Sequence, residues 1–256
     1  MKDALVFGKN YGVPQLRPRV LIVGIRNDVA FTWISGMPAG GLIPEPTSLA
    51  PDLIDMLSDL VDPEYSNGGA TRSYPHHPHN RLQEELRQDP RTLRAREEGA
   101  HLTEHEYSSH SETVRSRFLH MMENNGDKPQ GFSTRKFSQR LLPPRWGDAG
   151  PTITAASMPD DYVHFSQPRS LTVREWARLQ TFPDWYEFHG PRTTGGAKRA
   201  GTPAGQFLDR ELPKYTQIGN AVPVFLAKAI GDHFMSILNG TRESEDRLVT
   251  QSRVTA

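Results

Sequence analysis

The chain has 256 residues, enough for one large domain or two modest ones. Thirty basic and thirty acidic residues balance, so a nucleic-acid surface would have to come from local clustering, and the absence of cysteine excludes disulfides and thiolate metal sites. No apolar leader and no stretch approaching a membrane span is apparent, which predicts a soluble intracellular protein. The 21 glycines and 21 prolines predict long loops around a limited core.

The first predicted element is a buried strand from Val20 to Ile25, an apolar run rich in β-branched residues that follows Pro14 and Pro18. A strand this close to the amino terminus has few neighbours, so either the protein is cut here or another chain completes its sheet. Just before it, Arg17 and Arg19 would point to the same side of an extended segment, where they could grip a phosphate or a carboxylate. The alternative is that they are ordinary surface arginines at a strand entrance.

The middle of the chain, from about residue 27 to 165, is irregular. Residues 81–100 hold ten charged side chains, five of each sign, which favours a solvated helix or a mobile arm over a binding face. Residues 128–146 are basic, with no acidic residue and with interleaved aromatic residues. This segment could bind phosphates and read guanine edges, although such patterns also mark ordinary surface patches.

Helical order returns near Thr172, which with Glu175 fits a capping box and predicts a short helix that stops before Pro183. Residues 190–205 form a glycine-rich basic loop. Asn220 is a plausible cap for a second helix, and the residues after Gly240 are expected to form a polar, frayed tail. That second helix would keep one apolar face inward, with Leu226, Ile230, Phe234 and Ile237.

Six histidines lie between residues 76 and 110, three of them in a proline-rich turn. A metal site needs convergent ligands in a rigid setting, and no motif here supplies one. No metal is therefore predicted, and the histidines are interpreted as loop residues: His76, His77, His79, His101, His105 and His110.

Three segments, taken in order, resemble the carboxy-terminal motifs of DNA (cytosine-5) methyltransferases. They are Tyr11-Gly-Val-Pro-Gln-Leu-Arg-Pro-Arg19, then Arg169-Ser-Leu-Thr-Val-Arg-Glu-Trp-Ala-Arg-Leu-Gln-Thr-Phe-Pro-Asp184, then Gln217-Ile-Gly-Asn-Ala-Val-Pro223. The resemblance covers both ends of the chain and only the last third of the family's motif set. The family's catalytic cysteine in a Pro-Cys element, its Glu-Asn-Val element and its glycine-rich cofactor turn are absent and would lie upstream of Met1.

The resemblance implies roles for individual residues. Arg17 and Arg19 would contact the target nucleotide, with Arg19 holding the extruded cytosine near its O2 carbonyl. Arg174 and Glu175 would be scaffolding that braces the recognition region. The last motif would line part of the S-adenosyl-L-methionine pocket through Gly219, Asn220 and Ala221. Double-stranded DNA would be bound by Arg135, Lys136, Arg140 and Arg145.

The implied fold is α/β, the back part of a Rossmann-like methyltransferase domain plus a small, irregular, mostly β target-recognition domain. Residues 1–30 would carry the last catalytic-domain strands with the Gln-x-Arg-x-Arg motif, and residues 31–168 the recognition region with a charged insert. Residues 169–240 would form the brace and the closing helix, followed by a polar tail from 241 to 256.

Three functions follow as hypotheses. The chain could be the second subunit of a split cytosine-5 methyltransferase, whose amino-terminal subunit carries the Pro-Cys and Glu-Asn-Val elements. It could instead be a DNA-binding specificity module with no catalytic role, or a truncated, inactive remnant. A bacterial cytoplasmic, nucleoid-associated protein is expected, with a cognate restriction endonuclease as a possible companion.

Overall fold

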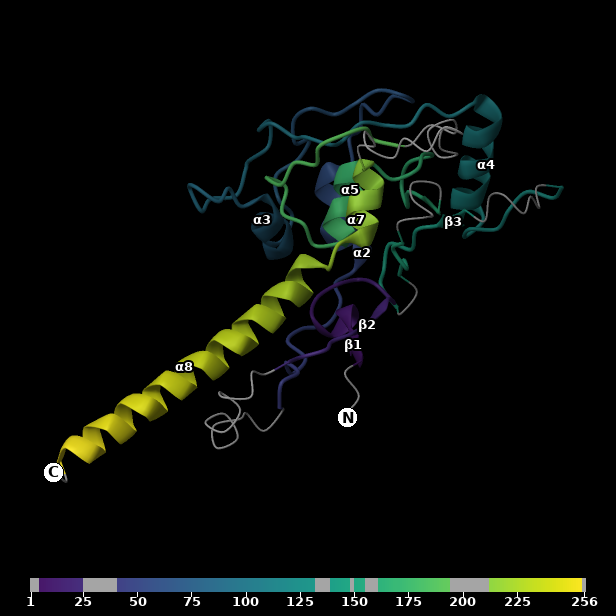
Figure 1. Cartoon of the computed structure of the whole chain (residues 1–256). Coiled ribbons are helices and arrows are strands. Elements are labelled where there is room, and N and C mark those ends of the chain that lie inside the picture. Colours follow the sequence, from purple (N-terminus) through teal and green to yellow (C-terminus); the bar gives the residue numbers. More distant parts are fainter. Residues whose placement is uncertain are drawn as a thin grey trace, which may run out of the picture.

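The computed structural model describes residues 5–24, 41–131, 139–147, 150–154, 161–193 and 212–254. Most helices gather in one body, and one long carboxy-terminal helix projects away from it (Figure 1). In chain order the elements are β1 Leu5–Phe7, η1 Gly8–Asn10, β2 Pro18–Val20, α2 Leu53–Leu57, η2 Ser58–Leu60, α3 Arg81–Arg87, α4 Glu112–Glu123, β3 Arg140–Leu141, β4 Tyr162–Val163, α5 Val173–Leu179, α7 Lys214–Asn220 and α8 Val224–Val254.

Helix α5 is the centre of the main core. All seven of its residues are buried, and the helices α2 and α7 pack against it. The main core is the cluster of buried apolar side chains around it, which includes Leu53, Met56, Tyr74, Trp176, Leu179 and Ile218. A helix of seven residues is too short to be stable alone, so its stability comes from this packing.

The capping box predicted at the start of α5 is confirmed. The Thr172 hydroxyl accepts a hydrogen bond from the Glu175 amide, and the Glu175 carboxylate accepts one from the Thr172 amide. The helix ends at Leu179, four residues before Pro183, also as predicted. This element was predictable because all of its signals lie within a few residues of each other.

The predicted strand from Val20 to Ile25 is wrong in extent and in burial. Strand β2 ends at Val20 and pairs antiparallel with β1, with Leu5 opposite Val20 and Phe7 opposite Pro18. The side chains of Val20 and Ile22 are 69% and 88% exposed. A β-branched run becomes a buried strand only where neighbours cover it, and among the described residues β2 has β1 alone.

The recognition region is less β-rich than predicted. Strands β3 and β4 form a parallel pair only two residues long, and isolated bridges join a few loop residues elsewhere. Over the described part of residues 31–168, helices and loops dominate. Buried side-chain hydrogen bonds, described below, hold these loops in place of a strand ladder.

The charged segment 81–100 is not simply a solvated arm. Asn80 caps α3 by accepting a hydrogen bond from the Gln83 amide. One face of α3 is in the main core, where Leu86 is 1% exposed and Arg87 is fully buried against Asp59. The segment therefore contributes an ion pair to the interior, which balanced composition alone could not reveal.

The helix start predicted at Asn220 is wrong, since Asn220 is the last residue of α7 and the next helix begins at Val224. Pro223 explains this shift, because its fixed φ suits the residue just before a helix. The frayed tail predicted after Gly240 is also replaced by helix, because α8 continues to Val254.

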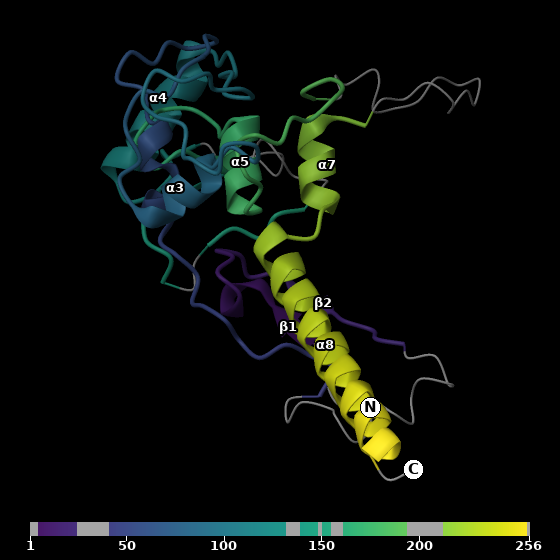
Figure 2. The same cartoon turned by 90° about the vertical axis from the view of Figure 1, so that its left-hand side faces the viewer.

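The first turns of α8 cover the β1–β2 pair (Figure 2). Leu226 and Ala229 of α8 join Val6, Tyr11 and Val13 in a second core. The stretch Lys214–Asn239 is long and apolar enough to cross a membrane by length and composition, contrary to expectation. It is broken between α7 and α8, and only part of it packs into the two cores, since 22% of its apolar window is buried.

Candidate functional site

The three motif segments meet at one joint. Gln15, 2% exposed, donates from Nε2 to the Leu179 carbonyl and to Gln180 Oε1, both at 2.8 Å. Gln180 in turn donates from Nε2 to the Ile218 carbonyl at 2.8 Å. We call this set, together with Arg17, the motif joint. A buried amide with its donors satisfied fixes its neighbours firmly, because breaking one bond would leave a polar group unpaired.

Arg17 extends the motif joint to the recognition region. Its Nη1 donates to the carbonyl of Ile153 at 2.7 Å and to the carbonyl of Gly219 at 2.8 Å. The adjacent Leu16 amide donates to the Pro151 carbonyl at 3.4 Å. One guanidinium thus ties the Gln-x-Arg-x-Arg loop to the stretch 150–154 and to the end of α7.

Arg19 lies beside Arg17 and is partly buried. No described residue accepts a hydrogen bond from it or pairs with it as a carboxylate. Burial, and then the positive charge of Arg17, lower the pKa of Arg19. A partly desolvated guanidinium beside a second cation can donate hydrogen bonds to an electronegative atom of a ligand.

The turn between α7 and α8 fits the expected cofactor role poorly. Gly219 is buried and its carbonyl is taken by Arg17, while the Ala221 amide donates to carbonyls of α7. The first amides of α8 are also occupied, since Val224 donates to the Gln180 carbonyl and Phe225 to the Thr181 hydroxyl. The Gly219 carbonyl and the amides of Ala221, Val224 and Phe225 are therefore engaged within the protein. The Asn220 side chain is exposed and remains accessible.

A buried ionic network braces α5 against α2 and α3. Arg178 pairs with Asp59 at 2.5 Å and with Asp184 at 2.6 Å, and Arg87 pairs with the same Asp59 at 2.6 Å. All four side chains are fully buried, and Tyr74 donates to Asp184. We call this set the brace network. Charges buried this deeply are tolerated only when each is paired and hydrogen-bonded.

Arg174 and Glu175 lie where a scaffolding role requires. Arg174 donates to the carbonyls of Thr103 and Tyr186. Glu175 is fully buried and holds Arg169 through two hydrogen bonds of 2.7 and 2.6 Å. Burial is the largest influence on Glu175 and opposes its ionisation, but Arg169 and the neighbouring histidines together lower the pKa of the carboxyl.

Two of the middle histidines are part of this scaffold. His105 is buried with Nε2 3.0 Å from the Leu60 carbonyl and Nδ1 2.9 Å from the Thr172 hydroxyl. Because a carbonyl only accepts, Nε2 carries the proton and the ring is neutral. Burial lowers the pKa of His105 to about 4. His110 contacts Ser170, so these two side chains are more than loop histidines. Among the described residues no group of three potential metal ligands gathers.

The predicted DNA-binding residues are only partly placed. Arg140 is exposed at β3, with its guanidinium 4.7 Å from the centre of the Tyr162 ring, and Arg145 is exposed in the loop that follows. Arg135 and Lys136 lie outside the described residues. Trp146, one of the interleaved aromatic residues, packs against the main core. DNA binding by this segment remains a prediction.

Sequence reasoning missed the residues that join these parts. Gln15 stands inside the first motif, but only its arginines drew attention, and Gln180 was considered only as a helix residue. Asp59 lies 119 positions from Arg178, and no local signal marks it as the partner of two buried arginines. Buried acidic residues of this kind can be found only when the fold is known.

Comparison with known proteins identifies the family. The family model described as C-5 cytosine-specific DNA methylase matches residues 3–236. The type II methyltransferase M.DdeI of Desulfomicrobium norvegicum is 30% identical over 263 residues, covering 95% of this chain and 57% of that protein. M.BsuRI of Bacillus subtilis is 32% identical over 231 residues, covering 88% of this chain and 40% of that protein. The chain spans about half the length of these curated relatives.

Two further matches differ in kind. The type II methyltransferase M.AquIB of Picosynechococcus is 32% identical over 131 residues, which are 51% of this chain but 85% of that protein. A crystal structure described as a prophage-encoded DNA modification methyltransferase from E. coli matches with a TM-score of 0.59 and 20% identity. It covers 93% of this chain and 60% of that one, and at this identity it shows a shared fold alone. From the family model and the relatives, the chain belongs to the C-5 cytosine-specific DNA methylases.

Proposed function

We propose that this chain is the target-recognition and closing part of a DNA (cytosine-5) methyltransferase. It would act with a polypeptide that carries the catalytic cysteine, in a separate subunit or in a longer form of the protein. Together they would transfer a methyl group from S-adenosyl-L-methionine to C5 of cytosine in a specific sequence of double-stranded DNA. Its architecture would be the back part of a Rossmann-like domain joined to a recognition region, acting in the bacterial cytoplasm.

The motif joint is the observation that carries the proposal. It joins Arg17, two residues before Arg19, to the recognition stretch at Ile153 and to the closing motif at Gly219. An enzyme that extrudes a base must hold the base and the surrounding duplex in a fixed relation. Direct hydrogen bonds between the segments expected to perform these tasks support that role.

A second polypeptide segment is needed for the chemistry. The sequence has no cysteine, and in this family the attacking thiolate adds to C6 of the cytosine before C5 takes the methyl group. The exposed apolar side chains of Val20 and Ile22 at the β1–β2 pair suit a surface that further strands would cover. The match to M.AquIB supports a short polypeptide in this role, because 85% of that type II methyltransferase lies within the match.

The described residues would contribute little to the cofactor pocket. The amides of Ala221, Val224 and Phe225 are engaged within the protein, so this turn would line the pocket mainly through the exposed Asn220, between Gly219 and Ala221. S-adenosyl-L-methionine would supply the methyl group when bound to the complete enzyme. The role that we assign to this chain is to hold the extruded base and the recognised duplex.

The test is methyl transfer by a reconstituted pair. The chain should be co-purified with the polypeptide that carries the Pro-Cys and Glu-Asn-Val elements and assayed for transfer of labelled methyl groups to DNA. We expect transfer by the pair, none by the lone chain, and none by a pair whose partner cysteine is replaced by serine. An intact pair that transfers no label, or a lone chain that turns over, would contradict the proposal.

Arg19 offers a sharper test within that pair. Arg19→Ala should lower kcat by about 100-fold or more, because a positioned donor to a developing charge is worth that much in other enzymes. Duplex affinity should change far less, since Arg19 would act on the extruded base. Arg140→Ala is the matched control and should weaken duplex binding or relax the target sequence instead. Equal loss of duplex binding and methylation in Arg19→Ala would show that Arg19 only contacts a phosphate.

A binding-only module is the second candidate function. The main core and its brace network are complete among the described residues, so the recognition region could fold and bind DNA without any catalytic partner. A gel-shift with the isolated chain decides this. No sequence preference at moderate salt would count against a specificity module.

A further inference from the structure

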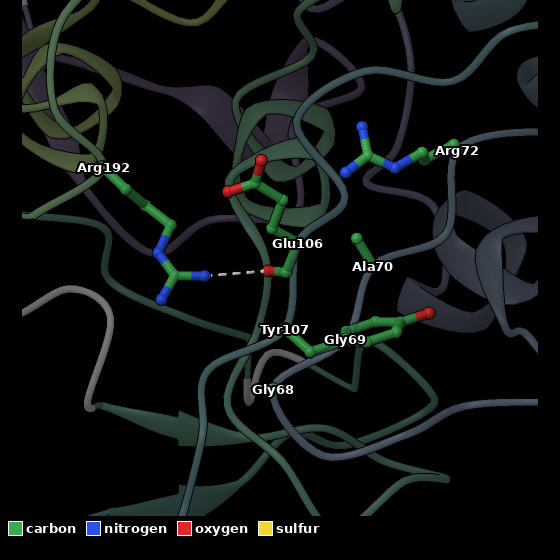
Figure 3. A pocket seen from close by; sticks show the side chains of 7 residues that line it. All are labelled: Gly68, Gly69, Ala70, Arg72, Glu106, Tyr107 and Arg192. Atoms are coloured by element: carbon green, nitrogen blue, oxygen red, sulfur yellow. Dashed lines mark hydrogen bonds between the residues drawn. The ribbon is translucent and has the colours of Figure 1, made fainter.

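An open pocket of about 530 Å³ lies at one side of the recognition region, away from the motif joint residues. Three segments that are distant in the sequence form it: the loop 68–72, residues 106 and 107, and Arg192 after α5 (Figure 3). An antiparallel bridge between Ala70 and Glu106 fixes two of these segments, with the Tyr107 amide donating to the Gly69 carbonyl at 2.8 Å. The pocket is therefore held by backbone hydrogen bonds.

One wall of the pocket is bare backbone. Gly68 has a φ of +78°, in the left-handed region that glycine adopts without strain. A Cβ on the adjacent Gly69 would collide with Ser66. The Cβ positions of Gly68 and Gly69 thus face Ser109 and Ser66, so glycine is required here by the tight packing of the loop.

Two arginines approach the hollow from separate segments. Arg192 is anchored by a hydrogen bond of 3.2 Å from Nη1 to the Glu106 carbonyl, while Arg72 extends from the opposite side in Figure 3. No carboxylate of the described residues forms an ion pair with either one. The contrast is with the arginines of the interior, which are paired with carboxylates: Arg87, Arg169 and Arg178.

The carboxylate of Glu106 stands between the two guanidinium groups and sets the charge of the pocket. Two cations and one anion leave a single net positive charge on the lining residues. A phosphodiester carries one negative charge and presents oxygens that suit the planar donors of arginine. The lining charge therefore complements one phosphodiester group.

We propose that this pocket binds one backbone phosphate of the DNA duplex, through Arg72 and Arg192. The inference rests on the proposed function, because it assumes that the chain binds duplex DNA. Such a contact fixes the register of the protein on the duplex without reading its sequence. The Glu106 carboxylate would weaken the contact by repelling the phosphate. Removing its charge should therefore tighten DNA binding, which a purely structural role of Glu106 would not produce.

The experiment measures duplex affinity of the full chain by fluorescence anisotropy over a range of salt concentrations. Each phosphate contact contributes about 0.9 to the slope of log affinity against log salt. Arg72→Gln and Arg192→Gln should each weaken binding several-fold and lower that slope by up to about 0.9. Glu106→Gln should tighten binding. Arg91→Gln is the matched control, since Arg91 is exposed outside the pocket, and it should change the slope less.

The outcomes separate this inference from the proposed function. Slopes unchanged in both pocket variants, slopes lowered equally by Arg91→Gln, or weaker binding by Glu106→Gln would overturn the pocket alone. An unsubstituted chain that does not bind duplex would overturn both proposals.

Discussion

The region around α5 and the region around β1 and β2 differ in how fully their side chains are buried. Around α5, the main core encloses seven consecutive buried residues, and even its charges are paired inside the protein. Around β1 and β2, the second core has apolar side chains on one side and the exposed Val20 and Ile22 on the other. Among the described residues, the interior around α5 is thus closed, whereas the β1–β2 pair leaves apolar side chains exposed on one side.

The largest effect should come from opening the brace network. Asp59→Ala would remove the carboxylate partner of Arg87 and leave Arg178 with Asp184 alone. Removing one partner of a buried ion pair lowers the free energy of unfolding by about 3–5 kcal/mol. Urea denaturation of the variant measures this loss. The control is Asp55→Ala, on the exposed face of α2, which should change it by less than about 0.5 kcal/mol. Similar losses in both variants would show that the main core does not depend on this network.

Lowering the pH should destabilise the region around α5 through its buried histidines before the buried carboxylates become protonated. Burial lowers the pKa of His105 to about 4 and that of His164 to about 3, whereas unfolded histidine titrates near 6.5. Between these values the unfolded chain binds protons that the folded chain does not. Stability is therefore fully present above about pH 6.5 and falls below it, by at most about 1.4 kcal/mol per pH unit for each histidine.

The midpoint of urea denaturation, measured from pH 7.5 to pH 4.5, tests whether stability falls toward acid pH. His105→Gln should flatten the profile, since it removes one of the two groups, although it also lowers the plateau by disturbing the bond to Leu60. A profile that rises toward acid pH would mean that one of these rings is protonated in the folded protein.

The motif joint should give an intermediate effect. Gln15→Leu removes the donor to the Leu179 carbonyl and to Gln180 Oε1, both buried. Leaving such acceptors unpaired costs about 1–3 kcal/mol. Hydrogen exchange should rise at the amides of residues 179–181 and 218–221 while α4 stays unchanged. Uniform exchange throughout the chain would instead mean that the variant loosens the whole fold.

The smallest effect on stability should come from the uncovered sheet. Ile22→Ser replaces a side chain that is 88% exposed, so the unfolding free energy of the isolated chain should change by less than about 0.5 kcal/mol. Its association with the cysteine-bearing polypeptide should weaken at least several-fold, measured by titration calorimetry. Unchanged association would place the partner elsewhere.

These contrasts explain how much could be predicted from the sequence. The α5 capping box and the stop before Pro183 were predictable because their signals are local. The strand at Val20 and the helix start at Asn220 were misplaced because burial and neighbouring proline decide such boundaries. The motif order predicted the family, whereas the joint at Gln15 and Gln180 and the pairing of Asp59 depend on contacts between residues more than a hundred positions apart.

The Arg17 contacts have one further consequence. Both of its acceptors are main-chain oxygens, of Ile153 and of Gly219, so the bonds do not depend on which side chains these positions carry. A change of the exposed Thr152 side chain would therefore leave this anchorage intact, whereas Ile153 is itself fully buried in the main core. The stretch 150–154 can thus vary at its surface while its attachment to α7 is preserved.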